Sequence, residues 1–403
     1  MPVPAPPIRT LDALLPEPLP LMMGVGPTPI PEPVARAHAR VLNHLGPLMN
    51  GVVESLKDLG RYVLQTGNPR VFGISGPGSA AMEMAMANLL WPGRRALVVV
   101  NGTFSGRLAE MGRRAEAEVV TLGVAPGHGV DPERVAEALK QGRFDVVAMV
   151  QGETSCGACN FAVPEVAALA QQAGALMVVD TVVTLSTMPL QTDDWGLDVV
   201  LSAGQKGLAC VPGISLVTFS ERAWQQIEAR PKPPAQWVLD ARLAASFWME
   251  HTYHYTAPTS SILALHEALR LIAEETLPIR HDRHERHSRA VQRGMEALGL
   301  EMFAPPEHRL RSALAIRLPP GLDAPTLLAH MEERFNIQMA GAFGLPIFRV
   351  GQLGEQCRRE PVLRTMDAMG QSLAALGVPC DPRAGVEAAE AVLGEVEVGR
   401  VAG

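Results

Sequence analysis

The stretch Leu201–Phe219, LSAGQKGLACVPGISLVTF, decides the fold because it joins two apolar strands through a tight loop that holds a lysine. We expect the strands at Val199–Ser202 and Ser215–Phe219, with Lys206 among small residues between them. Desolvation in such a loop disfavours the ammonium form. The neutral amine that results is the nucleophile that Schiff-base chemistry needs. A lysine that only caps a loop carbonyl is an equally good explanation of these residues alone.

Apolar, β-branched runs recur upstream of this stretch, with amphipathic helices between several of them. The expected strands are Val71–Ser75, Ala96–Val100, Glu118–Leu122, Val146–Val150 and Leu176–Asp180, and two of the expected helices are Ser79–Leu90 and Pro132–Lys140. Buried strands that alternate with helices predict an α/β fold with a mostly parallel sheet, here of seven strands between helices.

The alternation fades after Phe219, and a helical region is expected from Ser260 to Leu298. Its segment HDRHERHSR, residues 281–289, predicts a solvated helix face rather than a metal site, because no cysteine or carboxylate cluster accompanies it. A smaller α/β pattern then runs from Ala313 to a helix at Pro361–Leu376. The predicted units are a proline-rich arm (1–22), a large domain (23–265), a small domain (266–390) and a tail (391–403).

Composition narrows the class of protein. The chain has 403 residues, 47% of them hydrophobic and 19% charged, which is ordinary for a globular protein with a sizeable core. Its net charge of -7, without a basic stripe, disfavours a nucleic-acid partner. No apolar run is long enough for a membrane helix, and no secretory signal is recognisable. Five cysteines, an odd number, then predict reduced thiols and a cytoplasmic location.

An acidic residue ends one of the buried strands. In ALMVVDTVV, Asp180 follows four apolar residues, and a buried carboxylate must be paired or hydrogen-bonded. In parallel sheets the carboxyl ends of the strands face the ligand crevice. A pyridinium nitrogen would be a good partner there, while a helix N-cap or a metal ligand would also explain the residue.

A glycine-rich turn follows the first strand of the sheet. In ISGPGSAAMEMAMANLL it leads into a helix, whose N-terminal N–H groups make a ready phosphate site. The spacing matches neither the dinucleotide GxGxxG motif nor the GxxxxGK[ST] motif, so a single phosphate suits it better.

A phosphate cup, a buried aspartate and a loop lysine, in this order, resemble the enzymes of fold type I that use pyridoxal phosphate. More closely, the chain resembles the class V aminotransferases, the group of the serine/alanine–glyoxylate aminotransferases, over about Gly24–Leu376. The segments that carry this resemblance are GVGPTPIPEPV, SGPGSAAME, NGTFSGR, ETSCG, VVDTV, SAGQKGL…PG, YHYTAP and FRVGQLG.

The resemblance implies a role for each matching residue. Lys206 would form the Schiff base with pyridoxal phosphate, Asp180 would pair with the ring nitrogen, and Phe104 would stack on the ring. Thr154 would bond the side of the ring hydroxyl, and the phosphate would lie on Gly78, Ser79 and Gln205. Tyr253 and Thr256 would reach the phosphate of a neighbouring subunit, which implies a homodimer with shared active sites. Gly26 and Arg349 would bind the substrate, and the guanidinium of Arg349 would bind the carboxylate of that substrate. No metal is expected.

Several segments depart from the family pattern. The usual GPGP reads Gly24-Val25-Gly26-Pro27, the ESSTG-like segment reads ETSCGAC, and TVVTLSTMPL follows Asp180. Asn43–Met49, NHLGPLM, replaces a more polar segment at the substrate entrance. These changes leave the cofactor chemistry intact and bear on the choice of substrate.

The remaining thiols and His254 are expected to have structural roles. Cys156 and Cys159 form a CxxC, but a redox or metal role would need a second pair or a thioredoxin-like setting. Cys210 is expected to pack, and His254 to be structural rather than part of the pocket.

We therefore predict a transaminase that moves an amino group from alanine or serine to glyoxylate or pyruvate. Alternatives are a relative that acts on ureidoglycine, an aminophosphonate or pyridoxamine, and a lyase or desulfurase on the same fold. For a desulfurase, Cys357 would be the candidate nucleophile. A scaffold without enzymatic activity is the alternative from another class, and it predicts that Lys206→Ala is tolerated.

Overall fold

A seven-stranded sheet forms the centre of the computed structural model, which describes residues 3–342 and 344–395. Its strands are β2 (Val71–Ser75), β3 (Arg95–Val100), β4 (Glu118–Gly123), β5 (Val146–Val150), β8 (Leu176–Asp180), β9 (Val199–Ala203) and β10 (Ile214–Phe219). Their order is β2-β10-β9-β8-β5-β3-β4, and only β10 runs antiparallel to its neighbours. All seven strands expected from the sequence are confirmed.

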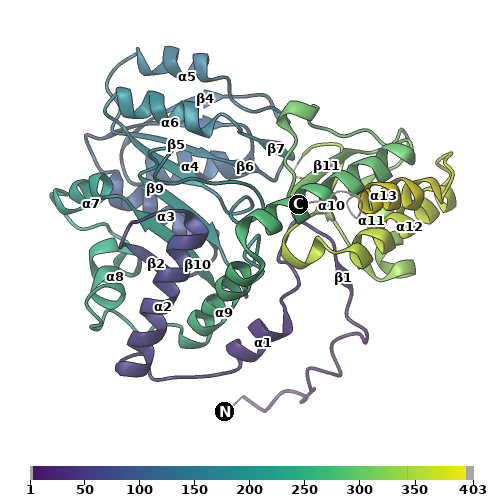
Figure 1. Ribbon diagram of the computed structural model, residues 1–403, viewed down its shortest axis with the longest axis horizontal. Helices are drawn as coiled ribbons and strands as arrows, with labels where there is room; N and C mark the ends of the chain where they lie inside the picture. Colours follow the sequence, from purple (N-terminus) through teal and green to yellow (C-terminus); the bar gives the residue numbers. More distant parts are fainter. Residues whose placement is uncertain (1–2, 343, 396–403) are drawn as a thin grey trace, which may run out of the picture.

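Helices pack against both faces of this sheet (Figure 1). They are α1 (Glu32–His38), α2 (Pro47–Leu64), α3 (Gly78–Leu89), α4 (Thr103–Arg114), α5 (Pro132–Leu139), α6 (Val163–Gln172), α7 (Glu221–Glu228), α8 (Ala241–Trp248) and α9 (Thr259–Glu275), with a 3-10 turn at Trp237–Leu239. Strands β5, β8 and β9 are buried along their whole length, as expected for parallel strands covered on both faces. A short hairpin, β6 (Gly152–Glu153) and β7 (Ala158–Cys159), follows β5.

The C-terminal part of the described chain builds a smaller sheet with helices packed around it (Figure 1). Its elements are α10 (Leu277–Ala297), β11 (Ala313–Arg317), α11 (Ala324–Phe335), β12 (Ile337–Gln338), β13 (Ala340–Gly341), β14 (Ile347–Gly351), α12 (Arg359–Ala375) and α13 (Ala384–Gly394), with 3-10 turns at Pro306–His308 and Gly354–Gln356. The sheet order is β11-β14-β13, all antiparallel. The second α/β pattern of the sequence is thus confirmed.

Two segments are more buried than their charge suggests. The prediction that residues 281–289 form a solvated face is wrong, because Arg283, His284 and His287 are buried in α10. Lys57 is likewise buried in α2 and paired with Glu54 at 2.9 Å. Hydrogen-bonded and oppositely charged partners offset the desolvation of these charges, and helical charge patterns do not reveal such partners.

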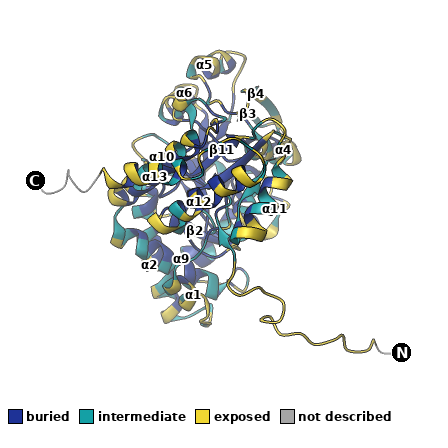
Figure 2. Cartoon of the chain, turned by 90° about the vertical axis from the view of Figure 1, so that its right-hand side faces the viewer, coloured by how far each residue is buried: buried dark blue, intermediate teal, exposed yellow. Residues whose placement is uncertain are grey.

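The first described residues form an exposed arm that projects from the body (Figure 2). β1 (Leu21–Met22) ends this arm and pairs in parallel with β12. The predicted domain limits are still predictions. We propose that the large unit extends to Leu277, because α9 and Leu277 pack in the hydrophobic core of the large sheet. Residues 396–403 of the predicted tail lie outside the described residues. Within residues 3–342 and 344–395, no helix is long and apolar enough to cross a membrane.

Candidate active site

A cavity of about 210 Å³ lies where the carboxyl ends of the parallel strands meet the first turn of α3. Predicted cofactor-binding residues from five separate segments line this cavity: Gly78, Ser79, Phe104, Thr154, Asp180, Gln205 and Lys206. The topology explains the convergence, since β8 and β9 are parallel neighbours and Asp180 and Lys206 follow the same edge of the sheet.

Lys206 lies in the loop after β9, against the segment that contains Gly26. Its Nζ donates a hydrogen bond to the carbonyl oxygen of Val25. Gly26 has φ +94°, and a Cβ there would lie 2.6 Å from Cδ of Lys206, so only glycine fits. Burial lowers the pKa of Lys206 to about 8, the charge of Arg349 acts in the same direction, and Asp180 opposes both. The amine is thus neutral in a larger fraction of molecules than an exposed lysine at the same pH.

This lowered pKa predicts a pH dependence for Schiff-base formation. With a pKa of about 8, the neutral fraction of the Lys206 amine rises about tenfold between pH 7 and pH 9 and then levels off. We expect the rate at which the cofactor-free protein reacts with pyridoxal phosphate, followed by visible absorbance, to show this plateau. For an ordinary lysine side chain, such as that of Nα-acetyl-lysine amide in the same buffers, the rate of this reaction continues to rise above pH 9. A protein rate that follows this control would contradict the assignment.

Asp180 ends β8 and is buried. Its Oδ1 accepts a hydrogen bond from the N–H of Val182 at 2.7 Å. Burial raises the pKa of Asp180 to about 7; the Val182 N–H and Lys206 counteract this rise, and Glu153 adds to it. A cationic partner would stabilise the ionised form of this buried carboxyl group, so the site fits a protonated pyridine nitrogen.

The other end of the cavity fits a phosphate group. Helix α3 begins at Gly78 after Pro77, which provides no side-chain cap, so its first N–H groups face the cavity without intrahelical partners. A Cβ on Gly78 would lie 2.9 Å from Cγ2 of Val182, so glycine keeps this end open. Gln205 also lines this cavity, and the Nε2 group of its side-chain amide is the donor that it can offer to a phosphate.

Two charged residues of this site were missed in the sequence. Arg107 lines the cavity, its Nη1 lies 3.3 Å from Oγ of Ser79, and its guanidinium lies 4.7 Å from the centre of the Phe104 ring. The signal was present in NGTFSGR, because residues three apart share a helix face. The second, Glu153, could not be found by spacing, since its partners lie 48 and 49 residues away.

Glu153 holds the start of α4, the helix that presents Phe104. Its carboxylate accepts hydrogen bonds from the N–H groups of Phe104 at 3.3 Å and Ser105 at 2.8 Å. The hydroxyls of Ser105 and Ser155 donate to it at 2.9 and 2.5 Å. A carboxylate at a helix N-terminus is stabilised by these donors and by the helix dipole. Glu153 thereby fixes the ring of Phe104 at the cavity wall.

Arg349 lies in β14, with only 5% of its surface exposed. Its Nη1 donates to the carbonyl oxygen of Thr154 at 2.9 Å and its Nε to that of Gly341 at 2.8 Å. Burial lowers its pKa, which Glu153 opposes. These contacts hold the guanidinium of Arg349 against Thr154, which forms part of the cavity wall.

The remaining predicted residues do not line this cavity. Tyr253 is 61% exposed and Thr256 is exposed. The ring of His44, from the segment Asn43–Met49, lies 5.7 Å from the Tyr253 ring, so this segment adjoins Tyr253 instead of the cavity. His254 is buried and lies 3.3 Å from the carbonyl oxygen of Trp237, in agreement with its expected structural role.

Four of the five thiols, those of Cys156, Cys159, Cys210 and Cys357, are buried, and burial keeps them protonated. Burial raises the pKa of Cys156 to about 11 and that of Cys159 to about 12. The same effect raises the pKa of Cys210 and of Cys357 to about 12. Cys357 is also fully buried, and its Sγ lies 3.3 Å from Oε1 of Gln352. A desulfurase needs a mobile, reactive thiolate, which Cys357 does not provide.

A loop lysine and a strand-end aspartate beside a helix N-terminus define a pyridoxal-phosphate-dependent enzyme of fold type I, as expected from the sequence. The family model of class V aminotransferases matches residues 34–364, and the chain belongs to this family of transaminases. The cofactor is therefore pyridoxal phosphate.

Similar proteins carry related names. The alanine–glyoxylate aminotransferase of Felis catus is 32% identical over 362 residues, 88% of this chain and 87% of the relative. The crystal structure of alanine–glyoxylate aminotransferase from Nostoc sp. superposes with a TM-score of 0.86 at 35% identity, covering 91% of this chain and 100% of that chain. The ureidoglycine–glyoxylate aminotransferase from Bacillus subtilis gives 0.90 at 28% identity, with 94% and 99% covered.

Proposed function

We propose that this transaminase moves the amino group of alanine or serine to glyoxylate or pyruvate. The observation that carries the proposal is a small cavity lined by Lys206 and Thr154, with the buried Arg349 donating to the Thr154 carbonyl oxygen and lowering the pKa of Lys206 by its charge. One carboxylate clamp suits substrates with a single carboxylate. The names of the relatives from Felis catus and Nostoc sp. support alanine as the donor and glyoxylate as the acceptor.

Each residue has a separate task in the proposed reaction. Pyridoxal phosphate, when bound, supplies the electron sink. Ser79, Gln205 and the first N–H groups of α3 hold its phosphate, Asp180 holds its ring nitrogen, and Phe104 and Thr154 fix the ring. Lys206 takes the proton from the substrate Cα and later returns a proton, which is general acid–base catalysis by an amine of suitable pKa. Arg349 orients the carboxylate, while Gly26 leaves room for Lys206.

The direct test is incubation of the cofactor-loaded protein with L-alanine or L-serine and glyoxylate. We expect loss of the visible cofactor band with the donor alone, and formation of glycine once glyoxylate is added. A protein that shows the band, but neither loses it nor forms glycine with any small amino acid, would refute the proposal.

A second candidate donor is ureidoglycine, which the name of the Bacillus subtilis relative supports, since that relative is 28% identical over 96% of this chain. The altered turn Gly24-Val25-Gly26-Pro27 lies beside Lys206, where a different donor would be selected. Parallel assays with alanine, serine and ureidoglycine, with glyoxylate as the common acceptor, rank these donors by kcat/KM.

We further propose a homodimer with shared active sites. The exposure of Tyr253 and Thr256 supports it, because residues that serve a partner's phosphate must lie on the surface of their own subunit. The His44–Tyr253 contact would then place Asn43–Met49 at the partner's substrate entrance. Sedimentation equilibrium of the loaded protein tests the dimer, and a monomer that is fully active would exclude shared sites.

Arg107 gives a test of the phosphate end. We expect Arg107→Gln to weaken pyridoxal phosphate binding about 10- to 100-fold, since a hydrogen bond to a charged group contributes about 1.5–3 kcal/mol. Binding of pyridoxal, which lacks the phosphate, should not change. Titration of the cofactor-free protein measures both affinities. Arg114→Gln, on the same helix and paired with Glu110 at the surface, is the control. An equal loss for pyridoxal would show that Arg107 supports only the structure.

A further inference from the structure

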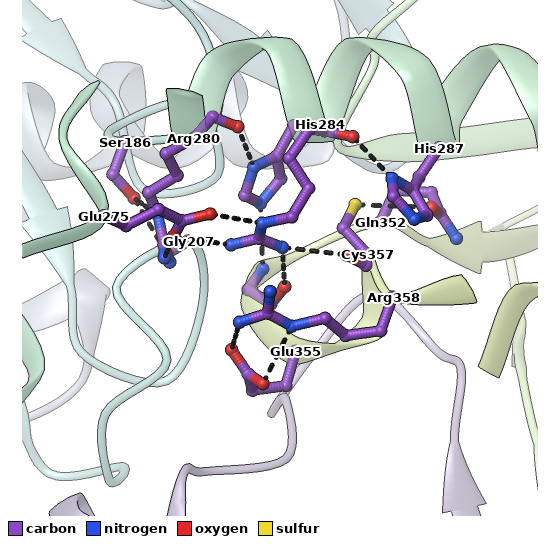
Figure 3. Close-up of polar contacts among 12 residues, drawn as sticks. Ser186, Gly207, Glu275, Arg280, His284, His287, Gln352, Glu355, Cys357 and Arg358 are labelled. Carbon is purple, nitrogen blue, oxygen red and sulfur yellow. Dashed lines mark hydrogen bonds and ion pairs between the residues drawn. The ribbon is translucent and has the colours of Figure 1, made fainter. Parts of the chain in front are cut away.

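A charged face of α10 is buried between the two parts of the proposed active site. Arg280, Arg283, His284 and His287 share this face by their helical spacing, and their exposed fractions are 3%, 6%, 0% and 6%. Figure 3 shows the side chains of Arg280, His284 and His287 on one side of the helix, the side on which Gly207 and Cys357 lie. Neither the cofactor nor the substrate needs these residues for contact, so their burial calls for another explanation.

Arg280 holds the lysine loop. Its Nη2 donates to the carbonyl oxygen of Gly207, the residue after Lys206, at 2.8 Å. Oγ of Ser186 donates to the same oxygen at 2.9 Å and lies 3.2 Å from Nε of Arg280. Gly207 also packs closely on Leu185, since a Cβ on Gly207 would lie 2.4 Å from the Leu185 carbonyl oxygen. The peptide next to the catalytic amine is thereby fixed from two directions.

Arg283 holds the turn that follows β14, the strand of Arg349. Its Nη1 donates to the carbonyl oxygens of Gly354 at 2.9 Å and Cys357 at 2.8 Å. The N–H of Gly354 donates to Nε2 of His284 at 3.1 Å. His284 is therefore neutral and donates from Nδ1 to the carbonyl oxygen of Arg280 at 2.8 Å; burial and the charges of both arginines lower its pKa in agreement with this state.

Glu275 joins the two arginines. Its Oε2 lies 2.8 Å from Nη1 of Arg280 and 2.9 Å from Nη2 of Arg283, and its Oε1 accepts from Nε of Arg283 at 2.5 Å. Burial alone would raise the pKa of Glu275, but its hydrogen bonds and ion pairs with both arginines outweigh this effect and hold the pKa at about 2. The carboxylate is thus ionised over the working range of pH. One bidentate contact, from Arg283, and one single contact, from Arg280, hold the same carboxylate and make a rigid joint.

We propose that Glu275, Arg280 and Arg283, named here the α10 brace, are positioning residues that fix the amine of Lys206 relative to the guanidinium of Arg349. One end of the brace holds the peptide beside Lys206, and the other end holds the turn after the strand of Arg349. The turn itself packs on the lysine loop, where a Cβ on Gly354 would lie 2.7 Å from Cβ of Ala209. This inference rests on the roles proposed above for Lys206 and Arg349.

Two chemical probes distinguish a misplaced Arg349 guanidinium from a general loss of protein stability. Aminooxyacetate and methoxyamine both react with a Schiff base of pyridoxal phosphate and change its absorbance, but only aminooxyacetate carries a carboxylate for Arg349. The ratio of their second-order rate constants therefore measures how well the carboxylate clamp is placed relative to Lys206. A general loss of stability lowers the amount of active protein and leaves this ratio unchanged.

The variants Arg280→Lys and Arg283→Lys keep the positive charge but cannot hold Glu275 and the loop carbonyls together. We expect each to lower the ratio about tenfold, since a misplacement of about 1 Å can cost about 10²-fold. Arg222→Lys is the matched control. Arg222 likewise joins a carboxylate to a carbonyl oxygen, because it lies 3.3 Å from the carboxylate of Asp198 and 3.1 Å from the carbonyl oxygen of Ala175. These contacts lie at the ends of β8 and β9 that are opposite the cavity. This control should keep the wild-type ratio.

The outcomes are distinct. A wild-type protein without a visible cofactor band would refute the proposed function. A wild-type protein with the band but without a preference for aminooxyacetate would refute the proposed role of Arg349. Either result would also refute the proposal of the α10 brace. A wild-type preference that both brace variants retain would refute the brace alone. Should the arginine variants fail to fold, Ser186→Ala removes only one donor from Gly207, and we expect a smaller drop of the ratio, about threefold. An unchanged ratio in that variant would likewise contradict the brace.

Discussion

Lys206→Ala should abolish transamination while the protein remains folded. The variant has no amine to take the proton from the substrate Cα, and general acid–base catalysis alone accounts for about 10²–10⁴-fold in rate. It also loses the covalent attachment of the cofactor, so the visible band of the Schiff base should be absent at neutral pH. The measurements are steady-state turnover with saturating alanine and glyoxylate, and the absorbance spectrum before and after borohydride.

Lys140→Ala is the control for this substitution. Lys140 lies at the surface after α5 and is paired with Glu137 at 2.5 Å, far from the cavity. It should retain full turnover and the visible band. A Lys206→Ala protein that keeps either property would favour the scaffold without enzymatic activity or another source of the amine, and would remove the basis of the proposed reaction.

Asp180→Asn should lower kcat by about 10²–10³-fold. The variant leaves a cationic ring nitrogen in a buried site without its counter-charge, and truncation of one partner of a buried charged pair costs about 2–5 kcal/mol. Cofactor binding should weaken as well, and the protonation of the bound ring should fall. Single-turnover kinetics with alanine, followed at the cofactor band, isolates the proton-transfer step from product release.

Asp198→Asn is the matched control. Asp198 is also buried, next to the same sheet, but it accepts hydrogen bonds from Ser220 at 2.7 Å and the N–H of Met177 at 2.9 Å at the end of the strands opposite the cavity. We expect this variant to lower thermal stability and to leave the single-turnover rate unchanged. Equal rates in Asp180→Asn and wild type would exclude a role of the carboxylate in the reaction.

The fold was predictable from the sequence because its signals are local. Most strands of the large sheet are short apolar runs, and β5, β8 and β9 are buried along their whole length, as expected for parallel strands covered on both faces. The cluster around Lys206 was also predictable, because strand ends in a parallel sheet converge on one edge. The position of Arg349 came from the family resemblance, since nothing local distinguishes a buried arginine in β14 from an exposed one.

The rest depended on contacts between distant segments. Glu153 meets the start of α4 across 48 residues, and the brace joins Arg283 to residues about seventy positions later. Charged side chains become buried only where such partners exist, so the sequence of α10 alone predicted solvent exposure. Tyr253 and Thr256 differ from these buried residues. They are exposed in the single chain, because their proposed partner belongs to a second subunit.

The segment around Gly26 has a consequence for how the protein matures in the cell. Residues 21–28 are synthesised long before their partners, which are β12, the Gly351 N–H, which donates to the Met23 carbonyl oxygen at 2.7 Å, and the lysine loop. This segment is therefore made early but is among the last to reach its final position. A nascent chain that still lacks β12 and β14 cannot close the wall around Lys206, so we expect the cofactor to be captured after translation and not during it.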